Sequence, residues 1–262
     1  MKTVVGVQNR LERNCREGAF TLVELLVSIT IFLIVCTLGF SGVKFYKGLA
    51  SKSVCSSNLR QLAAATNMYC ADHMGFFFPY VTYGSDGSRT WYFGKENSPP
   101  GTAEGDRDLD KEAGPLYEYI QAVGSIEMCP GFDYGSAVWK EKFKGASYGY
   151  GYNWWLGGRS TGRVLMNVAN IKSGARTMLF GDCAQANTFQ PPASASNPML
   201  EEFYIIDQTE RTVHFRHANK ANILFVDGHV ESFDVFPGTE VRKVEGELLG
   251  RITAKGSMEY LK

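Results

Sequence analysis

Three histidines and an aspartate near the carboxyl end are side chains that could bind a metal ion. They are His214, His217, Asp227 and His229, and imidazole and carboxylate groups are common zinc ligands. Asp227 precedes Gly228, however, and an Asp-Gly pair between two apolar segments predicts a tight type I′ hairpin turn. On a strand, His214 and His217 would also point to opposite faces. We therefore expect a hairpin here rather than a metal site.

A second group of candidate ligands is acidic and alternates along the chain, as oxygen ligands do in calcium-binding loops. The group consists of Asp106, Asp108, Asp110 and Glu112. It lacks the central glycine that lets an EF-hand loop turn sharply around its ion. A solvated acidic loop is therefore the favoured interpretation, and calcium binding is the alternative.

The chain lacks the sequence patterns of common catalytic sites. Ser41, Ser147 and Ser232 do not lie in a G-x-S-x-G elbow, and there is no P-loop. The 27 basic residues equal the 27 acidic residues in number, so no net charge attracts nucleic acid. We predict neither an enzyme nor a nucleic-acid-binding protein.

The most informative carboxylate is Glu24, because it lies inside a long apolar segment. Residues 20–40 contain no other charged residue, and a helix of this length, at ~1.5 Å per residue, crosses a hydrocarbon core of ~30 Å. A carboxylate at this depth costs about 2.5–3.5 kcal/mol and needs a partner. We therefore predict a transmembrane helix in which Glu24 has a role beyond stability.

The flank before this helix predicts its orientation. Residues 1–19 contain more basic than acidic side chains, and positive flanks stay cytoplasmic, which places the carboxyl-terminal part outside. An ordinary secretory signal peptide has an apolar region of only about 7–15 residues. A lipoprotein cleavage site before Cys36 is disfavoured because bulky Val35 precedes it.

The segment GAFTLVELL, residues 18–26, resembles the type III leader-peptide motif of prepilins. The resemblance implies that prepilin peptidase cuts between Ala19 and Phe20, that Phe20 can be N-methylated, and that Glu24 pairs with the amino terminus of a neighbouring subunit. The family prefers Gly immediately before the cut, whereas here Ala19 takes that place. Cleavage after Ala19 keeps Glu24 at the fifth mature position, so we prefer it to cleavage after Gly18.

Beyond the membrane segment the helical pattern continues and becomes amphipathic. The residues that recur at spacings of four and three are Cys55, Leu59, Leu62, Thr66 and Tyr69. No proline interrupts residues 20–72, and Gly75 marks the end of the pattern. We predict one long helix with a transmembrane half, residues 20–42, and an amphipathic half, residues 43–75.

Residues 76–262 predict a globular domain of short strands. Segments 147–153 and 176–182 have strand-like patterns, and segments 222–226 and 229–233 flank the Asp-Gly pair as a hairpin. Asp182, at the end of one predicted strand, is a candidate polar partner for His217. The expected fold is α+β and pilin-like, with the second half of the helix packed on a small antiparallel sheet.

Four further features resemble a large pseudopilin-like family of planctomycete and lentisphaera bacteria. They are the segment CSSNLRQLAAATNMYCADHMG at 55–75, the pair Cys129-Pro130, the Tyr-Gly-Tyr-Asn run at 150–153, and His217 followed after nine residues by Asp227-Gly228. The last matches that family's H-x9-DG motif. Calcium also stabilises loops of many pseudopilins, which keeps the acidic residues 106–112 as weak candidates.

The cysteines beyond the membrane segment can pair if the domain faces an oxidising compartment. Cys55 and Cys129 are the favoured disulfide, because both lie beyond the membrane and Cys129 precedes Pro130 at a corner expected to face the helix.

These resemblances imply a structural subunit of a type II secretion pseudopilus. The expected protein is a single-pass protein of the bacterial inner membrane, with a cytoplasmic amino terminus and a periplasmic domain, and it enters a filament after processing. Its implied partners are other pilin or pseudopilin subunits, prepilin peptidase and the inner-membrane assembly platform. Two alternatives stay open: a type IV pilin for adhesion, motility or DNA uptake, and a membrane-tethered glycan- or substrate-binding module that uses exposed Trp91, Trp154 and Trp155.

Overall fold

The structure is a computed structural model, and it describes residues 21–99, 101–120, 126–145, 148–158 and 165–262; for residues 38–45 and 47 it describes the backbone only. The chain divides into two compact units, Met1–Phe45 and Tyr46–Lys262. One long helix, α1 (Leu22–Asp72), belongs to both units. The predicted amino-terminal helix is therefore confirmed over its described residues.

In the first unit, the apolar side chains of α1 are exposed. From Leu22 to Val35 every side chain is exposed, including large ones such as Phe32 and Leu33. Among the described residues, no helix combines the length and the hydropathy that a membrane crossing requires.

In the second unit, one face of α1 is buried, and it is the face that the sequence predicts. Cys55, Leu59, Leu62, Thr66 and Tyr69 are all buried. The helix ends where Met74 and Gly75 adopt positive φ angles of 53° and 83°, and the N–H of Gly75 donates to the carbonyl of Cys70 over 2.7 Å. Such a left-handed cap satisfies the last carbonyls of a helix.

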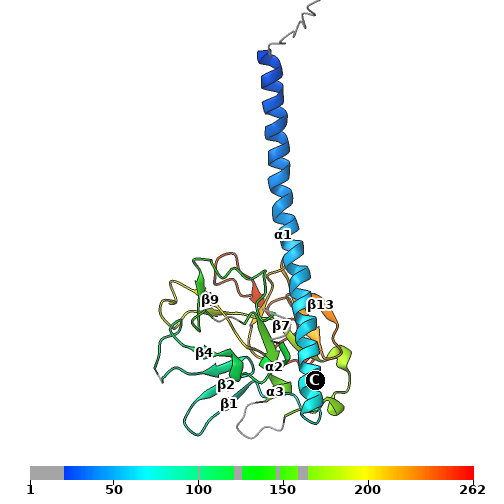
Figure 1. Cartoon of the computed structure of the whole chain (residues 1–262), viewed down its shortest axis with the longest axis vertical. Helices are drawn as coiled ribbons and strands as arrows, with labels where there is room; N and C mark the ends of the chain where they lie inside the picture. Colours follow the sequence, from blue (N-terminus) through cyan, green and yellow to red (C-terminus); the bar gives the residue numbers. More distant parts are fainter. Residues whose placement is uncertain (1–20, 100, 121–125, 146–147, 159–164) are drawn as a thin grey trace, which may run out of the picture. The chain divides into compact units, whose positions relative to one another are not determined.

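The largest sheet of the second unit has five strands in the order β10-β6-β7-β12-β13. These strands are β6 (Tyr150–Asn153), β7 (Met178–Asp182), β10 (Ile205–Ile206), β12 (Lys220–Phe225) and β13 (Val230–Asp234). All neighbours are antiparallel except β10 and β6. Figure 1 shows the second half of α1 in cyan beside this sheet.

Smaller sheets and short helices complete the unit. A four-stranded sheet contains β1 (Val81–Tyr83), β2 (Arg89–Trp91), β3 (Gly94–Glu96) and β4 (Leu109–Asp110); a three-stranded sheet contains β5 (Trp139–Lys140), β8 (Gln185–Asn187) and β9 (Met199–Glu201); and β11 (Val213–His214) pairs with β14 (Leu249–Gly250). The short helices are α2 (Tyr117–Ile120), α3 (Trp154–Gly157), η1 (Lys111–Ala113), η2 (Val168–Asn170) and η3 (Gly174–Arg176). The α+β class is therefore confirmed.

The predicted hairpin exists, but its turn is not type I′. Strands β12 and β13 pair with Leu224 opposite Val230, and the N–H of Phe225 donates to the carbonyl of His229. Three residues therefore form the loop, and of these only Gly228 has a positive φ, of 91°. A three-residue loop with a left-handed glycine at its end is the usual alternative to the two-residue turn.

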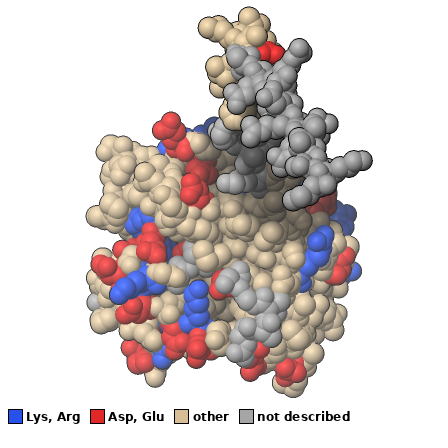
Figure 2. Space-filling model, turned by 45° about the horizontal axis from the view of Figure 1, so that its top comes forward, with Lys and Arg blue, Asp and Glu red and all other residues tan. Residues whose placement is uncertain are grey.

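Aromatic side chains fill the core between α1 and the sheets. Tyr92, Tyr150, Tyr152 and Phe180 are fully buried, and the rings of Phe78 and Tyr152 stack with centroids 4.5 Å apart. On the surface, acidic and basic side chains are interspersed over the face that Figure 2 presents. That face therefore offers no large region of one charge.

Candidate functional site

At the start of α1, Thr21 and Glu24 form a reciprocal pair. The N–H and the hydroxyl of Thr21 both donate to Oε2 of Glu24 over 2.9 Å, and the N–H of Glu24 donates to the Thr21 hydroxyl over 3.2 Å. This arrangement is a capping box, which the T-x-x-E spacing encodes and which our sequence reasoning missed. Glu24 remains exposed, while the predicted processing residues Ala19 and Phe20 lie outside the described residues.

Four side chains from distant parts of the second unit meet in one buried cluster. Cys55 comes from α1, Cys129 from the turn after α2, Asp182 from the end of β7 and His217 from the connection between β11 and β12. All four residues are buried, and their candidate ligand atoms lie within 4.8 Å of one another. Within the described part of the chain, this is the one group of three or more such side chains spaced closely enough to hold a metal ion. We refer to these four residues as the buried cluster.

The backbone around His217 holds its side chain in place. His217 and Lys220 exchange both backbone hydrogen bonds, 3.0 and 3.1 Å long, and Ala218 and Asn219 between them have φ angles of 53° and 63°. The type I′ turn predicted at Asp227-Gly228 thus occurs here instead. A left-handed alanine is strained, and such strain is frequent at functional sites. Gly131 makes room for the imidazole, since a Cβ there would lie 2.6 Å from Cε1 of His217.

Three distances define the cluster. Sγ of Cys129 lies 3.4 Å from Nε2 of His217, and that same Nε2 lies 3.4 Å from Oδ2 of Asp182. Sγ of Cys55 lies 3.4 Å from Oδ1 of Asp182. The partnership of Asp182 and His217 that the sequence suggested is therefore confirmed.

Arg216 and Asn222 surround the buried cluster. The Arg216 side chain is 2% exposed, and its Nε lies 3.5 Å from Oδ1 of Asp182. The backbone N–H of Asn222 donates to Oδ2 of Asp182 over 2.8 Å, and its Nδ2 donates to Sγ of Cys55 over 3.3 Å. The Asn222 Oδ1 accepts a hydrogen bond from Ser232, which fixes the amide with its nitrogen toward the sulfur.

The short distances within the buried cluster, together with its burial, shift the pKa values of all four side chains. Burial lowers the pKa of His217, but its hydrogen bonds to Asp182 and Cys129 outweigh that effect and raise the pKa to about 9. The hydrogen bond from Cys55 lowers the pKa of Cys129 to about 5, against the effect of burial. Burial raises the pKa of Cys55 well above its usual value. Burial also opposes ionisation of Asp182, yet Arg216 and His217 hold its pKa below the usual value.

This geometry differs from that of a nucleophilic Cys-His-Asp site. There the carboxylate binds Nδ1 of the imidazole, while Nε2 faces the nucleophile. Here Nε2 of His217 faces both Cys129 and Asp182, and Nδ1 has no hydrogen-bond partner among the described residues. The thiol is also fully buried. The cluster therefore resembles a set of ligands around a centre rather than a proton relay.

From the sequence alone, the residues of the buried cluster were predicted to interact in other combinations. Cys55 and Cys129 are adjacent in the cluster as free, buried thiols, so their disulfide stays a prediction. The four residues first considered as metal ligands do not meet, because His214 binds Glu247 at 2.6 Å and Asp227 binds His229 at 2.6 Å. The sequence did supply all four members of the cluster, but as two separate pairs.

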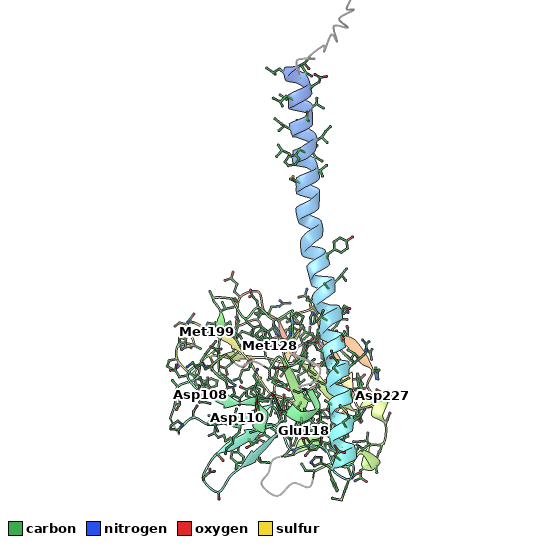
Figure 3. All side chains as sticks on the ribbon, viewed as in Figure 1. Asp108, Asp110, Glu118, Met128, Met199 and Asp227 are labelled. Carbon is green, nitrogen blue, oxygen red and sulfur yellow. The ribbon has the colours of Figure 1, made fainter. Side chains whose placement is uncertain are left out.

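The acidic residues predicted as weak calcium ligands do not gather around a common point. Asp110 caps helix η1 by accepting from the N–H of Glu112, and Glu112 in turn accepts from the Tyr117 hydroxyl over 3.3 Å. Figure 3 places Asp108 and Asp110 far from Asp227. Among the described residues, Asp106, Asp108, Asp110 and Glu112 do not place three side-chain ligand atoms close enough together to hold a metal ion, and calcium binding here stays a prediction.

The three tryptophans proposed as an exposed glycan-binding surface are half-buried, so the expectation that they are exposed is wrong. Trp91 packs against Tyr204, with ring centroids 5.3 Å apart, and Trp155 packs against the hydrophobic core. Aromatic side chains are the largest contributors to the burial of apolar area, which explains their position.

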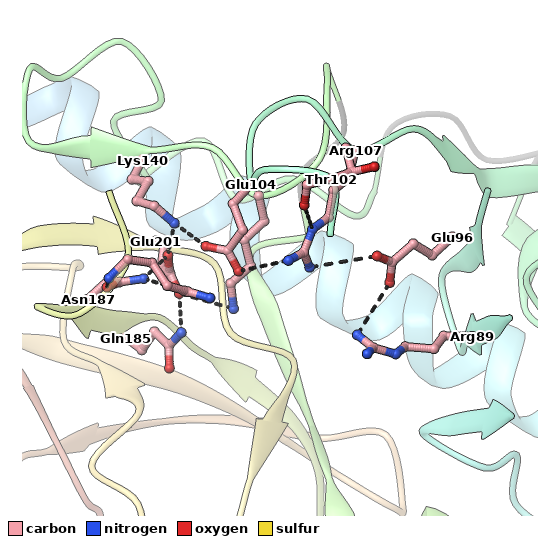
Figure 4. Close-up of polar contacts among 11 residues, drawn as sticks. Arg89, Glu96, Thr102, Glu104, Arg107, Lys140, Gln185, Asn187 and Glu201 are labelled. Carbon is pink, nitrogen blue, oxygen red and sulfur yellow. Dashed lines mark hydrogen bonds and ion pairs between the residues drawn. The ribbon is translucent and has the colours of Figure 1, made fainter. Parts of the chain in front are cut away.

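A second polar network lies between the small sheets. Glu201 is completely buried and lies 2.8 Å from Nζ of Lys140 and 3.1 Å from Nζ of Lys142. Figure 4 shows the network continuing from Lys140 through the side chains Glu104, Arg107, Glu96 and Arg89. Every charge in it lies beside one of opposite sign, so its role is to hold β5, β8 and β9 together.

Comparison with known proteins gives one finding. Residues 14–40 match the family model of the prokaryotic N-terminal methylation motif. Comparison with curated proteins and with solved structures gave no match. The matched segment contains the predicted processing site and Glu24, and the motif indicates a type IV pilin-like protein that prepilin peptidase processes.

Proposed function

We propose that this chain is a structural subunit of a pilus-like filament, and specifically a pseudopilin of a type II secretion system. The observation that carries the proposal is the N-terminal methylation motif at residues 14–40. The exposed apolar side chains from Leu22 to Val35 support it, because such a surface is stable in lipid or against the same segment of other subunits. The work of the protein would be mechanical, without a catalytic step.

In this proposal the precursor spans the inner membrane once, with residues 76–262 in the periplasm. Prepilin peptidase removes residues 1–19, and the α1 helices then stack in the filament core. The new amino group of Phe20 pairs there with Glu24 of a neighbour. Glu24 is exposed at the start of α1, so its pairing with Thr21 leaves the carboxylate accessible. In a low-dielectric core the two opposite charges are far less costly together than apart.

Mass spectrometry of the mature amino terminus tests the proposal. Full-length chain is produced with and without a prepilin peptidase, and the terminal peptide is sequenced. We expect a start at Phe20, with an added methyl group, only when the peptidase is present. Gly18→Ala is the matched control, because it removes the alternative cut after Gly18 and should leave the start at Phe20. An unprocessed chain, or a start beyond Phe40, contradicts the proposal.

Subunits of type IV pili would have the same architecture. The neighbouring genes distinguish a pseudopilus subunit from a pilus subunit. A secretin gene with general secretion components supports a pseudopilus, whereas a retraction ATPase gene supports a pilus for adhesion, motility or DNA uptake.

A further inference from the structure

The buried cluster has the composition of a zinc site. Two thiols, one imidazole and one carboxylate are the ligand types that zinc binds, and four ligands satisfy its tetrahedral coordination. We propose that Cys55, Cys129, Asp182 and His217 bind one Zn²⁺ ion, which joins α1 to the carboxyl-terminal sheet. The metal sites considered from the sequence had other ligand sets, and this site also goes beyond the proposed filament function.

The dimensions of the cluster fit this ion. Zinc lies about 2.3 Å from sulfur and about 2.0–2.2 Å from nitrogen or oxygen, so neighbouring ligands of a tetrahedral site are about 3.4–3.8 Å apart. Nε2 of His217 lies 3.4 Å from Sγ of Cys129 and 3.4 Å from Oδ2 of Asp182, and the other carboxylate oxygen, Oδ1, lies 3.4 Å from Sγ of Cys55. Taken with one ligand atom from each residue, all four lie within 4.8 Å of one another. Because Nε2 of His217 faces two other ligands, its lone pair points to the shared centre.

The charge of the surroundings suits a divalent cation. Without an ion, Asp182 is balanced by Arg216, whose Nε lies 3.5 Å away, and the thiols and imidazole together are neutral. Binding of Zn²⁺ would release two protons from the two cysteines and the histidine, which leaves the net charge of the buried group unchanged. A buried charge without compensation is strongly unfavourable, so this balance favours an ion of charge +2.

Outer contacts that support metal ligands are also present. The Asn222 Nδ2 donates to Sγ of Cys55, and Ser232 fixes the orientation of that amide. The backbone N–H of Asn222 donates to Oδ2 of Asp182. Hydrogen bonds of this kind orient first-layer ligands, and their loss costs about 10–100-fold in affinity.

A Cys55–Cys129 disulfide would use the same two cysteines but would remove their contacts with Asp182 and His217. Disulfide sulfurs cannot donate, so Asp182 would lose its hydrogen bond from Cys55, and His217 would lose the thiol that it contacts. Both polar groups are buried, so water would not replace the contact that each of them loses. Zinc binding uses all four side chains, and the geometry therefore favours it.

Metal analysis of the purified full-length chain tests the site. We expect about one equivalent of bound zinc, and a cobalt-substituted chain should show visible absorption of tetrahedral Co²⁺ together with thiolate-to-cobalt charge transfer. Cys129→Ser and His217→Gln should each weaken zinc binding by about 100-fold or more, and Asn222→Ala by about 10-fold. The cobalt spectrum is measured on the unmodified chain, so it tests the site even where a variant fails to fold.

Matched substitutions serve as controls. Cys70→Ser changes another buried cysteine of α1, and His214→Gln changes a buried histidine that binds Glu247 instead. Both should retain one equivalent of zinc. A metal-free chain whose Cys55 and Cys129 peptides are linked by a disulfide would overturn the proposal. Zinc that remains bound to folded Cys129→Ser and His217→Gln variants would overturn it as well. Neither result bears on the processing of the amino terminus, so the filament proposal is tested separately.

Discussion

The side-chain amide of Asn222 donates a hydrogen bond to the sulfur of Cys55 over 3.3 Å, although the two residues lie 167 positions apart in the chain. The same residue binds Asp182 through its backbone and Ser232 through its amide oxygen. A single asparagine of β12 therefore connects α1 with β7 and β13.

We predict that Asn222→Ala lowers the free energy of unfolding by about 1–3 kcal/mol, because buried Cys55 and half-buried Ser232 each lose a hydrogen-bond partner. Urea unfolding of the full-length chain in mild detergent measures the change. Asn170→Ala, at an exposed position of η2, should change the free energy by no more than about 0.5 kcal/mol. Equal effects of both substitutions would contradict the role assigned to Asn222.

At the amino terminus, Glu24→Leu should abolish or strongly reduce filament assembly while the variant chain is still inserted and processed. Leucine is more stable than glutamate in lipid, so loss of monomer stability would not explain the defect. Surface filaments are counted by electron microscopy, and processed protein in the membrane fraction is measured alongside.

Thr21→Val separates two explanations for that defect. The substitution removes the hydroxyl contacts of the capping box, at a cost of about 0.5–2 kcal/mol, but keeps the Glu24 carboxylate. If Glu24 pairs with a neighbour's amino terminus, Thr21→Val chains should still assemble. If Glu24 only caps its own helix, both variants should fail to the same degree.

Within the polar network of the small sheets, Glu201→Gln should destabilise the fold by about 3–5 kcal/mol. The change leaves the buried ammonium groups of Lys140 and Lys142 without their shared carboxylate, and removal of one member of a buried ion pair typically has this cost. The control is Glu259→Gln. It breaks the exposed pair with Arg176, which should cost less than about 1 kcal/mol. Thermal unfolding of the two variants gives the comparison.

The buried His214 predicts a dependence of stability on pH. Burial and the nearby Arg216 lower the pKa of His214 to about 4, from 6.5, despite its contact with Glu247. Between these two values the unfolded chain binds more protons than the folded chain, so stability falls as the pH decreases through this window. The contribution of His214 is on the order of 3 kcal/mol.

The comparison that isolates this contribution uses His214→Phe. Phenylalanine keeps an aromatic ring against Phe132, whose centroid lies 5.3 Å from that of His214, but it has no titrating group. Unfolding is measured from pH 4 to 7, and the slope of stability against pH should be smaller in the variant. Asn170→Ala, at an exposed position, changes no titrating group and should leave the slope unchanged. A slope that is identical in the wild type and the His214 variant would show that another group is responsible.

How much the sequence predicted depends on the distance over which each feature is encoded. The buried face of α1, from Cys55 to Tyr69, follows from a periodic pattern within one helix, and the structure confirms it. The hairpin after Phe225 was also predicted, but its turn type was wrong, because an Asp-Gly pair is compatible with loops of two or three residues.

The buried cluster could not be assembled from the sequence in the same way. No spacing rule relates Cys55 to Asp182, because the packing of α1 against β7, and not the sequence separation, brings them together. The prediction that Trp91 is exposed was wrong for a similar reason. The side chain that packs against it, Tyr204, belongs to a distant segment of the chain.

The contact between α1 and β12 also has a consequence for the order of events in biosynthesis. The helix is made early, whereas β12 and β13 are among the last strands to leave the ribosome. The part of α1 at Cys55, which contacts Asn222 of β12, therefore stays uncovered until almost the whole chain has been synthesised. Contacts between such distant segments slow folding and prolong the exposure of aggregation-prone surface. A chaperone that covers residues 55–69 during synthesis would protect the nascent chain at the point where it is most vulnerable.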